Sequence, residues 1–288
     1  MIRALVAIVA AFVASSGLAA TPVPGGKWSF VWTDTKGRAD RPMRVYTYRP
    51  RKCDSTCPMV FVLHGQKRNA AEFRDNWQSL ADHYSFLVIA PEFTQKNWPR
   101  AAGYNLGDAG EHKDRERWGF SAVEHLFDEM RVDQTSYVLF GHGAGGQFAQ
   151  RFALLRPDNR ASVIIVANAA WYTLPEWRKD KTPAAFPYSL VNAPVGEAEL
   201  RQALAHRLVV MAGDRDDDAD DESQDKNDGA AKQGDGRVDR AENFFKAATT
   251  AAQDLGVKLA WDLVEVPERV RDGEHFGTAA ADMLFEKK

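Results

Sequence analysis

The chain of 288 residues has few cysteines, little net charge and no long apolar run outside its N-terminus, and each shortage excludes a class of protein. Its only two cysteines are Cys53 and Cys57, with no histidine close by. They are too few for a disulfide-rich scaffold or a structural zinc site, which needs four ligands. No later segment approaches the ~18 apolar residues of a membrane helix. A formal charge of −3 gives no indication of affinity for nucleic acid.

The first twenty residues have the pattern of a secretory signal peptide. Arg3 precedes an apolar run from Ala4 to Val13, and small residues follow at 17–20. The apolar run is too short to cross a bilayer. We therefore expect a signal peptide at 1–20, a single domain at 21–288, and a secreted or periplasmic protein. A disulfide between Cys53 and Cys57 could persist in such an oxidising compartment.

Apolar segments of strand length alternate with helical patterns along the chain. The eight predicted strands are Trp28–Trp32, Met43–Tyr48, Met59–Leu63, Phe86–Ala90, Ser136–Phe140, Ser162–Val166, Leu208–Ala212 and Leu259–Val266. The predicted helices are Ala70–His83, Arg117–Met130, Gln147–Leu155, Arg240–Ala252 and Thr278–Glu286. This order predicts an α/β fold with a mostly parallel sheet, helices on both faces and an antiparallel edge formed by the first two strands.

Two segments interrupt this alternation. The first, residues 171–205, is rich in aromatic residues and prolines and is predicted to be a lid-like segment. Its aromatic side chains would either line a pocket or pack on the sheet. The second, residues 214–236, is an acidic, glycine-containing stretch that cannot bury itself and is predicted to be a mobile loop.

Part of this acidic region imitates a calcium-binding loop. Asp235 to Asp239, with Glu242, resembles the second half of an EF-hand loop. The first and third ligand positions would then be Ala231 and Gln233, which supply no carboxylate. We therefore expect no metal site here.

The most informative motif is the run Gly141-His142-Gly143-Ala144-Gly145-Gly146, between a predicted strand and a predicted helix. In the nucleophile elbow G-x-S-x-G, the central serine sits on a sharp strand-to-helix turn. Gly143 occupies that central position, so the frame is present and the nucleophilic atom is missing. The run also spells the dinucleotide pattern G-x-G-x-x-G. The next strand, however, ends in Asn168 rather than the acid that binds ribose, so no cofactor is expected.

Residues at the ends of neighbouring strands complete a candidate catalytic site, because ligand sites in such sheets lie at the carboxyl ends of the strands. His64-Gly65-Gln66 follows the strand Met59–Leu63. The backbone N–H groups of Gln66 and Ala144 could form an oxyanion hole.

An acid and a base are expected after the last two strands. Asp216 is the first choice for an acid that orients a histidine, and Asp214 is the alternative. His275 is predicted to lie in the loop before the final helix, where a catalytic base would be expected.

These motifs resemble the α/β-hydrolase superfamily, and within it the secreted esterase and polyhydroxybutyrate-depolymerase-like branch. The resemblance covers nearly the whole chain after residue 20. It rests on Leu63-His64-Gly65, Trp118-Gly119-Phe120, Leu126-Phe127-Asp128, the glycine run with Gln147-Phe148 and Arg151-Phe152, residues 168–175, Gln233-Gly234 and Phe244-Phe245. It implies an α/β-hydrolase fold, an ester substrate, and a Ser-Asp-His triad whose acid is Asp216 and whose base is His275.

The sequence departs from that family pattern in two places. Gly143 replaces the serine, and counting back from the end of the final helix puts Arg271 at an alternative base position. The leading hypothesis is a pseudoenzyme that binds a small or polymeric ester-like ligand or a protein partner. The alternative is an ester hydrolase whose serine was replaced in this copy by engineering or error, and a third is slow hydrolysis by directly activated water. The sequence carries no signal for the oligomeric state.

Overall fold

The computed structural model describes residues 23–110, 112–182, 184–213, 228–267 and 273–286. Eight strands form one sheet in the order β1-β2-β4-β3-β5-β6-β7-β8. β2 pairs antiparallel with both β1 and β4, and every other neighbouring pair is parallel. The predicted fold class, the eight strands and the antiparallel edge are confirmed.

The strands lie close to their predicted positions. They are β1 Gly26–Trp32, β2 Met43–Arg49, β3 Met59–Leu63, β4 Leu87–Pro91, β5 Tyr137–His142, β6 Ala161–Ala167, β7 Leu208–Gly213 and β8 Trp261–Val266. The α-helices are α1 Ala70–Asn76, α2 Gln78–Tyr84, α3 Arg100–Gly103, α4 Gly119–Met130, α5 Ala144–Leu155, α6 Glu197–Ala205, α7 Asp228–Ala231, α8 Arg237–Leu255 and α9 Gly273–Phe285. A short 3₁₀ helix spans Arg115–Arg117.

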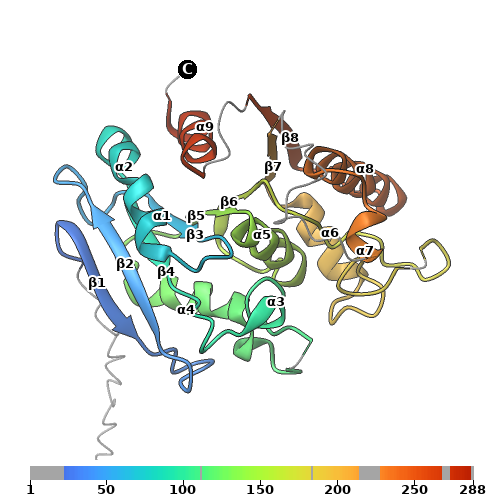
Figure 1. The fold of residues 1–288 in the computed structure, drawn as a ribbon, viewed down its shortest axis with the longest axis horizontal. Helices are drawn as coiled ribbons and strands as arrows, with labels where there is room; N and C mark the ends of the chain where they lie inside the picture. The colour runs from blue at the N-terminus through green and yellow to red at the C-terminus, as the bar shows by residue number, and fades with distance from the viewer. Residues whose placement is uncertain (1–22, 111, 183, 214–227, 268–272, 287–288) are drawn as a thin grey trace, which may run out of the picture.

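Helices cover both faces of the sheet (Figure 1). The strand residues alternate between the apolar clusters on the two faces. In β3, Phe61 and Leu63 belong to the apolar cluster shared with α4, α5, α6 and α8. Val60 and Val62 belong to the cluster on the opposite face, which α2 and α9 complete. Because successive side chains of a strand point to opposite faces, a central strand buried on both sides is apolar at every position.

All five predicted helices are present with shifted bounds: α4 begins two residues later than predicted, and α8 extends three residues further at each end. The other three differences affect the arrangement around the site. The predicted helix 70–83 is divided into α1 and α2 at Trp77, whose buried ring packs 4.8 Å from that of Phe140, centre to centre. α5 begins at Ala144, three residues earlier than predicted. α9 begins at Gly273, so His275 lies in its first turn and not in the preceding loop.

The lid-like segment, residues 171–205, contains a helix that the sequence prediction missed. α6 buries Leu200, Ala203 and Leu204, which are spaced as one face of a helix. The Glu199 carboxylate accepts a hydrogen bond from the Gly196 N–H at 3.0 Å and so satisfies the start of the helix. The prolines and aromatic residues earlier in the segment concealed this periodicity.

The two cysteines are joined as expected. The disulfide Cys53–Cys57 closes the turn that precedes β3, and both residues are buried. Among the described helices, none has the length and apolar character needed to span a membrane.

Candidate active site at the strand-to-helix corner

The glycine run forms a sharp corner between β5 and α5. Gly143 stands between the two elements with φ 58° and ψ −112°, a conformation that is strained for residues with a side chain. Its N–H donates to the Ala167 carbonyl at 3.0 Å, and its carbonyl accepts from the Gln147 N–H at 3.0 Å. The corner is therefore fixed to β6 on one side and to the first turn of α5 on the other.

Three neighbouring glycines are required by close backbone contacts. A Cβ on Gly141 would overlap the carbonyl of Gly145, and a Cβ on Gly145 would overlap the carbonyl of Leu63. A Cβ on Gly146 would lie 2.7 Å from the Ala167 carbonyl oxygen. At Gly143, by contrast, no atom of the described residues beyond its chain neighbours lies within 4 Å of the Cβ position. The corner needs glycine at the three packed positions, whereas a side chain at position 143 would overlap no described residue.

The contact at Gly145 also brings the two halves of the expected oxyanion hole side by side. Its Cβ would lie 2.9 Å from the His64 carbonyl oxygen, so the first turn of α5 touches the turn after β3. Gln66 is exposed in that turn, and the half-buried Ala144 is the first residue of α5. The backbones of the two predicted donors therefore belong to segments in direct contact.

The turn after β3 is held by a neutral, buried histidine. His64 accepts a hydrogen bond from the Phe93 N–H through Nε2 and donates one to the Gly65 carbonyl through Nδ1, both at 3.0 Å. Tyr104 donates its hydroxyl proton to the His64 carbonyl at 2.7 Å. Burial lowers the pKa of His64 to about 3. His64 therefore acts as a structural link between the turns after β3 and β4.

Arg68 fixes the same turn from its other end. Its backbone is left-handed, with φ 59°. Its guanidinium donates to the carbonyls of Phe93, Trp98 and Arg100, and lies 4.4 Å from the centre of the Tyr104 ring. Gln66 therefore lies between two anchored residues, His64 and Arg68, which restricts the direction of its N–H.

Of the residues predicted to act as the acid and the base, the structure describes only His275. Asp214, Asp216 and Arg271 lie outside the described residues. His275 is exposed in the first turn of α9. The next residue, Phe276, is buried, with its ring centre 5.3 Å from that of His142 in the corner. The start of α9 thus lies beside the corner.

Buried polar residues that were not predicted as site residues form hydrogen bonds with the beginning of the lid-like segment. The Gln233 side chain accepts from the Tyr172 N–H at 2.9 Å and donates to the Tyr172 carbonyl at 2.7 Å. Arg240 donates to the Ala170 carbonyl at 2.7 Å. Arg151 donates to the Thr173 hydroxyl at 2.9 Å and lies 4.1 Å from the centre of the Trp171 ring. The only signal in the sequence was that Gln233 and Arg151 belong to the family resemblance.

These contacts decide the role of two aromatic residues. Trp171 and Tyr172 are buried, and Tyr172 stacks on Phe244 of α8 with 4.5 Å between ring centres. Both side chains pack within the protein instead of lining an open pocket. No group of three or more potential metal-ligating side chains occurs among the described residues.

Two solved structures resemble this chain over nearly its whole length. Poly(aspartic acid) hydrolase-1 from Sphingomonas sp. KT-1 is 32% identical, with a TM-score of 0.84 over 92% of this chain and 100% of that one. The poly(3-hydroxybutyrate) depolymerase LpqC from Bordetella parapertussis is 31% identical, with a TM-score of 0.85 over 92% and 91%.

A more distant structure shares the fold alone. An S-formylglutathione hydrolase from Agrobacterium tumefaciens is 19% identical, with a TM-score of 0.56 over 92% of this chain and 95% of that one. No protein-family model and no curated protein matches the chain.

The contact between α5 and β3 predicts a large cost for adding one methyl group. Gly145→Ala places its Cβ against the Leu63 carbonyl and should lower the free energy of unfolding by about 2 kcal/mol or more. Gly110→Ala is the matched control, because its Cβ would meet no atom of the described residues within 4 Å. Urea unfolding of both variants measures the difference. Equal stabilities would contradict the close contact.

The neutral state of His64 predicts a loss of stability in acid. Below the ordinary pKa of 6.5, the unfolded chain protonates this histidine and the folded chain does not, down to about pH 3. Its contribution should fall by about 1.4 kcal/mol per pH unit in that window. His64→Gln retains a donor and an acceptor but does not titrate. The stability advantage of the parent over this variant should shrink by about 2 kcal/mol between pH 7 and pH 5. A constant advantage would show that the pKa of His64 is the same in the folded and the unfolded chain.

Proposed function

Because the chain belongs to the α/β-hydrolase family of poly(aspartic acid) hydrolase-1 and the depolymerase LpqC, we propose that it is an exported, esterase-type member with Gly143 at the nucleophile position. In this proposal it has little or no conventional serine-hydrolase activity and binds a small or polymeric ester-like ligand, or a protein partner.

The backbone of Gly143 carries this proposal. It has a positive φ at the corner between a central strand and a helix, which is the place where an α/β-hydrolase raises its nucleophile above the sheet. None of the described residues beyond its chain neighbours comes within 4 Å of the place where its side chain would begin. Glycine supplies no hydroxyl there, and loss of the nucleophile costs such enzymes on the order of 10⁶ in turnover.

Recognition of an ester carbonyl is the function left to the corner. The N–H groups of Ala144 and Gln66 are the proposed donors, since their segments touch through Gly145 and His64. Donors held in place before the ligand arrives lose little freedom on binding. The anchors at His64 and Arg68 support this role.

The acid and the base of the family are carried over as proposals. Asp216 is the proposed acid, with Asp214 as the alternative. His275 is the proposed base, supported by the contact of its neighbour Phe276 with His142 of the corner. Arg271 remains the alternative base position.

Export and domain organisation also belong to the proposal. Residues 1–20 have the pattern of a signal peptide, and the Cys53–Cys57 disulfide suits an oxidising compartment. A secreted or periplasmic location with one domain at 21–288 follows.

In a second candidate function, the parent protein is an active ester hydrolase, and its serine was replaced by glycine in this copy through engineering or error. The space beyond Gly143 favours it, because the Cβ of a serine would meet none of the residues that the structure describes. The glycines at 141, 145 and 146, which the corner requires, are all still present.

Restoring the hydroxyl separates the two candidates. Gly143→Ser and Gly143→Ala carry the same backbone strain and should each lower the free energy of unfolding by about 1–2 kcal/mol. Only the serine variant can react with a fluorophosphonate probe. If the rest of the site is intact, it should hydrolyse a short-chain aryl ester at least ~10³ times faster than the alanine variant.

Each outcome has a separate meaning. Activity in the serine variant alone would support a recently replaced nucleophile, and a silent serine variant would support loss of the base, with Arg271 at its position. Rapid hydrolysis by the unchanged protein would refute the pseudoenzyme proposal.

A further inference from the structure

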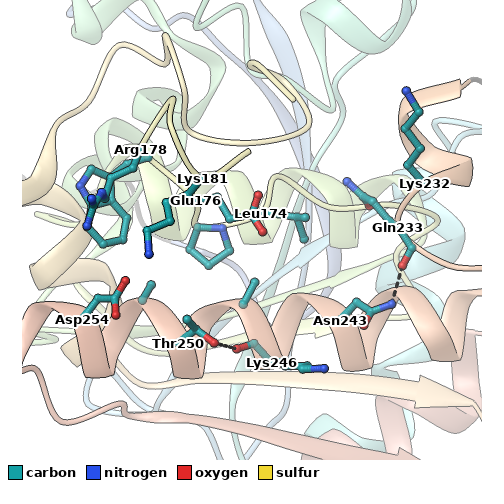
Figure 2. Close-up of a pocket in the computed structure, with 14 residues that line it drawn as sticks. Leu174, Glu176, Arg178, Lys181, Lys232, Gln233, Asn243, Lys246, Thr250 and Asp254 are labelled. Atoms are coloured by element: carbon teal, nitrogen blue, oxygen red, sulfur yellow. Dashed lines mark hydrogen bonds between the residues drawn. The ribbon is translucent and has the colours of Figure 1, made fainter. Parts of the chain in front are cut away.

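A cavity of about 470 Å³ lies between the lid-like segment and α8 (Figure 2). Its lining comes from residues 174–178 and 181 of the lid-like segment, from Lys232 and Gln233, and from one side of α8. The corner at Gly143, the turn after β3 and α9 contribute no lining residue. The cavity is therefore separate from the candidate active site, and its size is in the range of sites for small organic ligands.

Part of the cavity wall is apolar. Leu174, Pro175 and Trp177 line it from the lid-like segment, and Ala247 and Ala251 line it from α8. The two alanines are four residues apart and therefore lie on the same face of the helix. Their small side chains leave room beside the larger apolar groups opposite. This wall suits an alkyl or aryl group.

Positive charge predominates among the other lining residues. Lys181, Lys232 and Lys246 line the cavity, and none of the three is ion-paired with a described carboxylate. Arg178 is paired with Asp180 at 3.1 Å. The acidic lining residues are Glu176 and Asp254. The three unpaired ammonium groups favour an anion.

The lysines come from both sides of the cavity. Figure 2 shows Lys181 reaching from the lid-like segment toward α8, while Lys246 belongs to α8 itself. Figure 2 also shows the two side chains running toward different ends of the cavity, Lys181 on the side of Asp254 and Lys246 on the side of Asn243. A carboxylate would therefore form a charge-assisted hydrogen bond with one of these ammonium groups at a time.

Hydrogen bonds within the protein hold the frame around the cavity. Asn243 of α8 donates to the Gln233 carbonyl at 2.9 Å (Figure 2). The Gln233 side chain makes its two hydrogen bonds with Tyr172. These bonds join α8 to the beginning of the lid-like segment. The ligand therefore meets a wall that is already in place, which reduces the entropy lost on binding.

We propose that this cavity binds an organic carboxylate with an apolar body, such as a medium-chain fatty acid or an arylalkanoic acid. The apolar body packs between Trp177 and the alanines of α8, and the carboxylate lies near Lys181, with Lys246 adding positive charge from α8. The apolar wall favours such a ligand over inorganic anions. This proposal does not depend on the role of Gly143.

Binding is tested with ω-bromo-octanoate, because bromine quenches the fluorescence of a nearby tryptophan. Saturable quenching is expected, and Trp177→Phe should remove most of it. Octanoate should compete with the probe, while octanamide, which has the same chain and no charge, should compete at least about tenfold more weakly. Equal competition by octanamide would overturn the anionic part of the proposal.

Charge variants locate the carboxylate. The double substitution Lys181→Gln, Lys246→Gln should weaken octanoate binding about tenfold or more, as measured by calorimetry. Lys258→Gln removes the same charge from an exposed residue outside the cavity and should leave the affinity unchanged. An unchanged affinity in the double variant, or quenching that persists in Trp177→Phe, would refute this site. If inorganic phosphate bound with the same affinity as octanoate, the proposed apolar contact would be refuted.

Discussion

The structure of the candidate site depends on the close approach of α5 to the ends of β3 and β6. Gly145 lies against the carbonyls of Leu63 and His64, and Gly146 lies against the carbonyl of Ala167. Backbones approach this closely only where no Cβ intervenes. The approach places the start of α5 at the carboxyl ends of the central strands, where its first N–H groups meet the turn after β3. The geometry of this region is thus independent of any side chain at position 143.

The turns around the corner are anchored by hydrogen bonds of buried polar groups. His64 is held neutral and uses both ring nitrogens, while Arg68 satisfies several backbone carbonyls of the segment after β4. A buried polar group that lost its partner would carry a free-energy penalty, so these bonds favour one arrangement of the turns. This is how residues distant from the reaction centre can define the direction of the Gln66 N–H.

The two proposed binding regions would recognise ligands by different physical means. At the corner, the proposed donors are backbone N–H groups, which suit a neutral carbonyl oxygen. The cavity beside α8 combines an apolar wall with the ammonium groups of Lys181, Lys232 and Lys246, which form no ion pair with a described carboxylate. Gln233 and Arg240 connect α8 to the start of the lid-like segment, so one set of buried hydrogen bonds supports the segment that borders the cavity.

The sequence by itself determined the eight strands, because apolar runs bounded by turns define them locally. It also determined the corner between β5 and α5, because the spacing of the glycines matches the positions where backbones come into close contact. Only the tertiary structure showed that Trp77 interrupts a helix, that His275 lies within α9, and that buried residues such as Arg68 and Gln233 are anchors. Asp214, Asp216 and Arg271 stay predictions from the sequence. The division has a physical reason: periodicity records which face of an element is buried, whereas the partner of a buried polar group belongs to a distant part of the chain and leaves no local pattern.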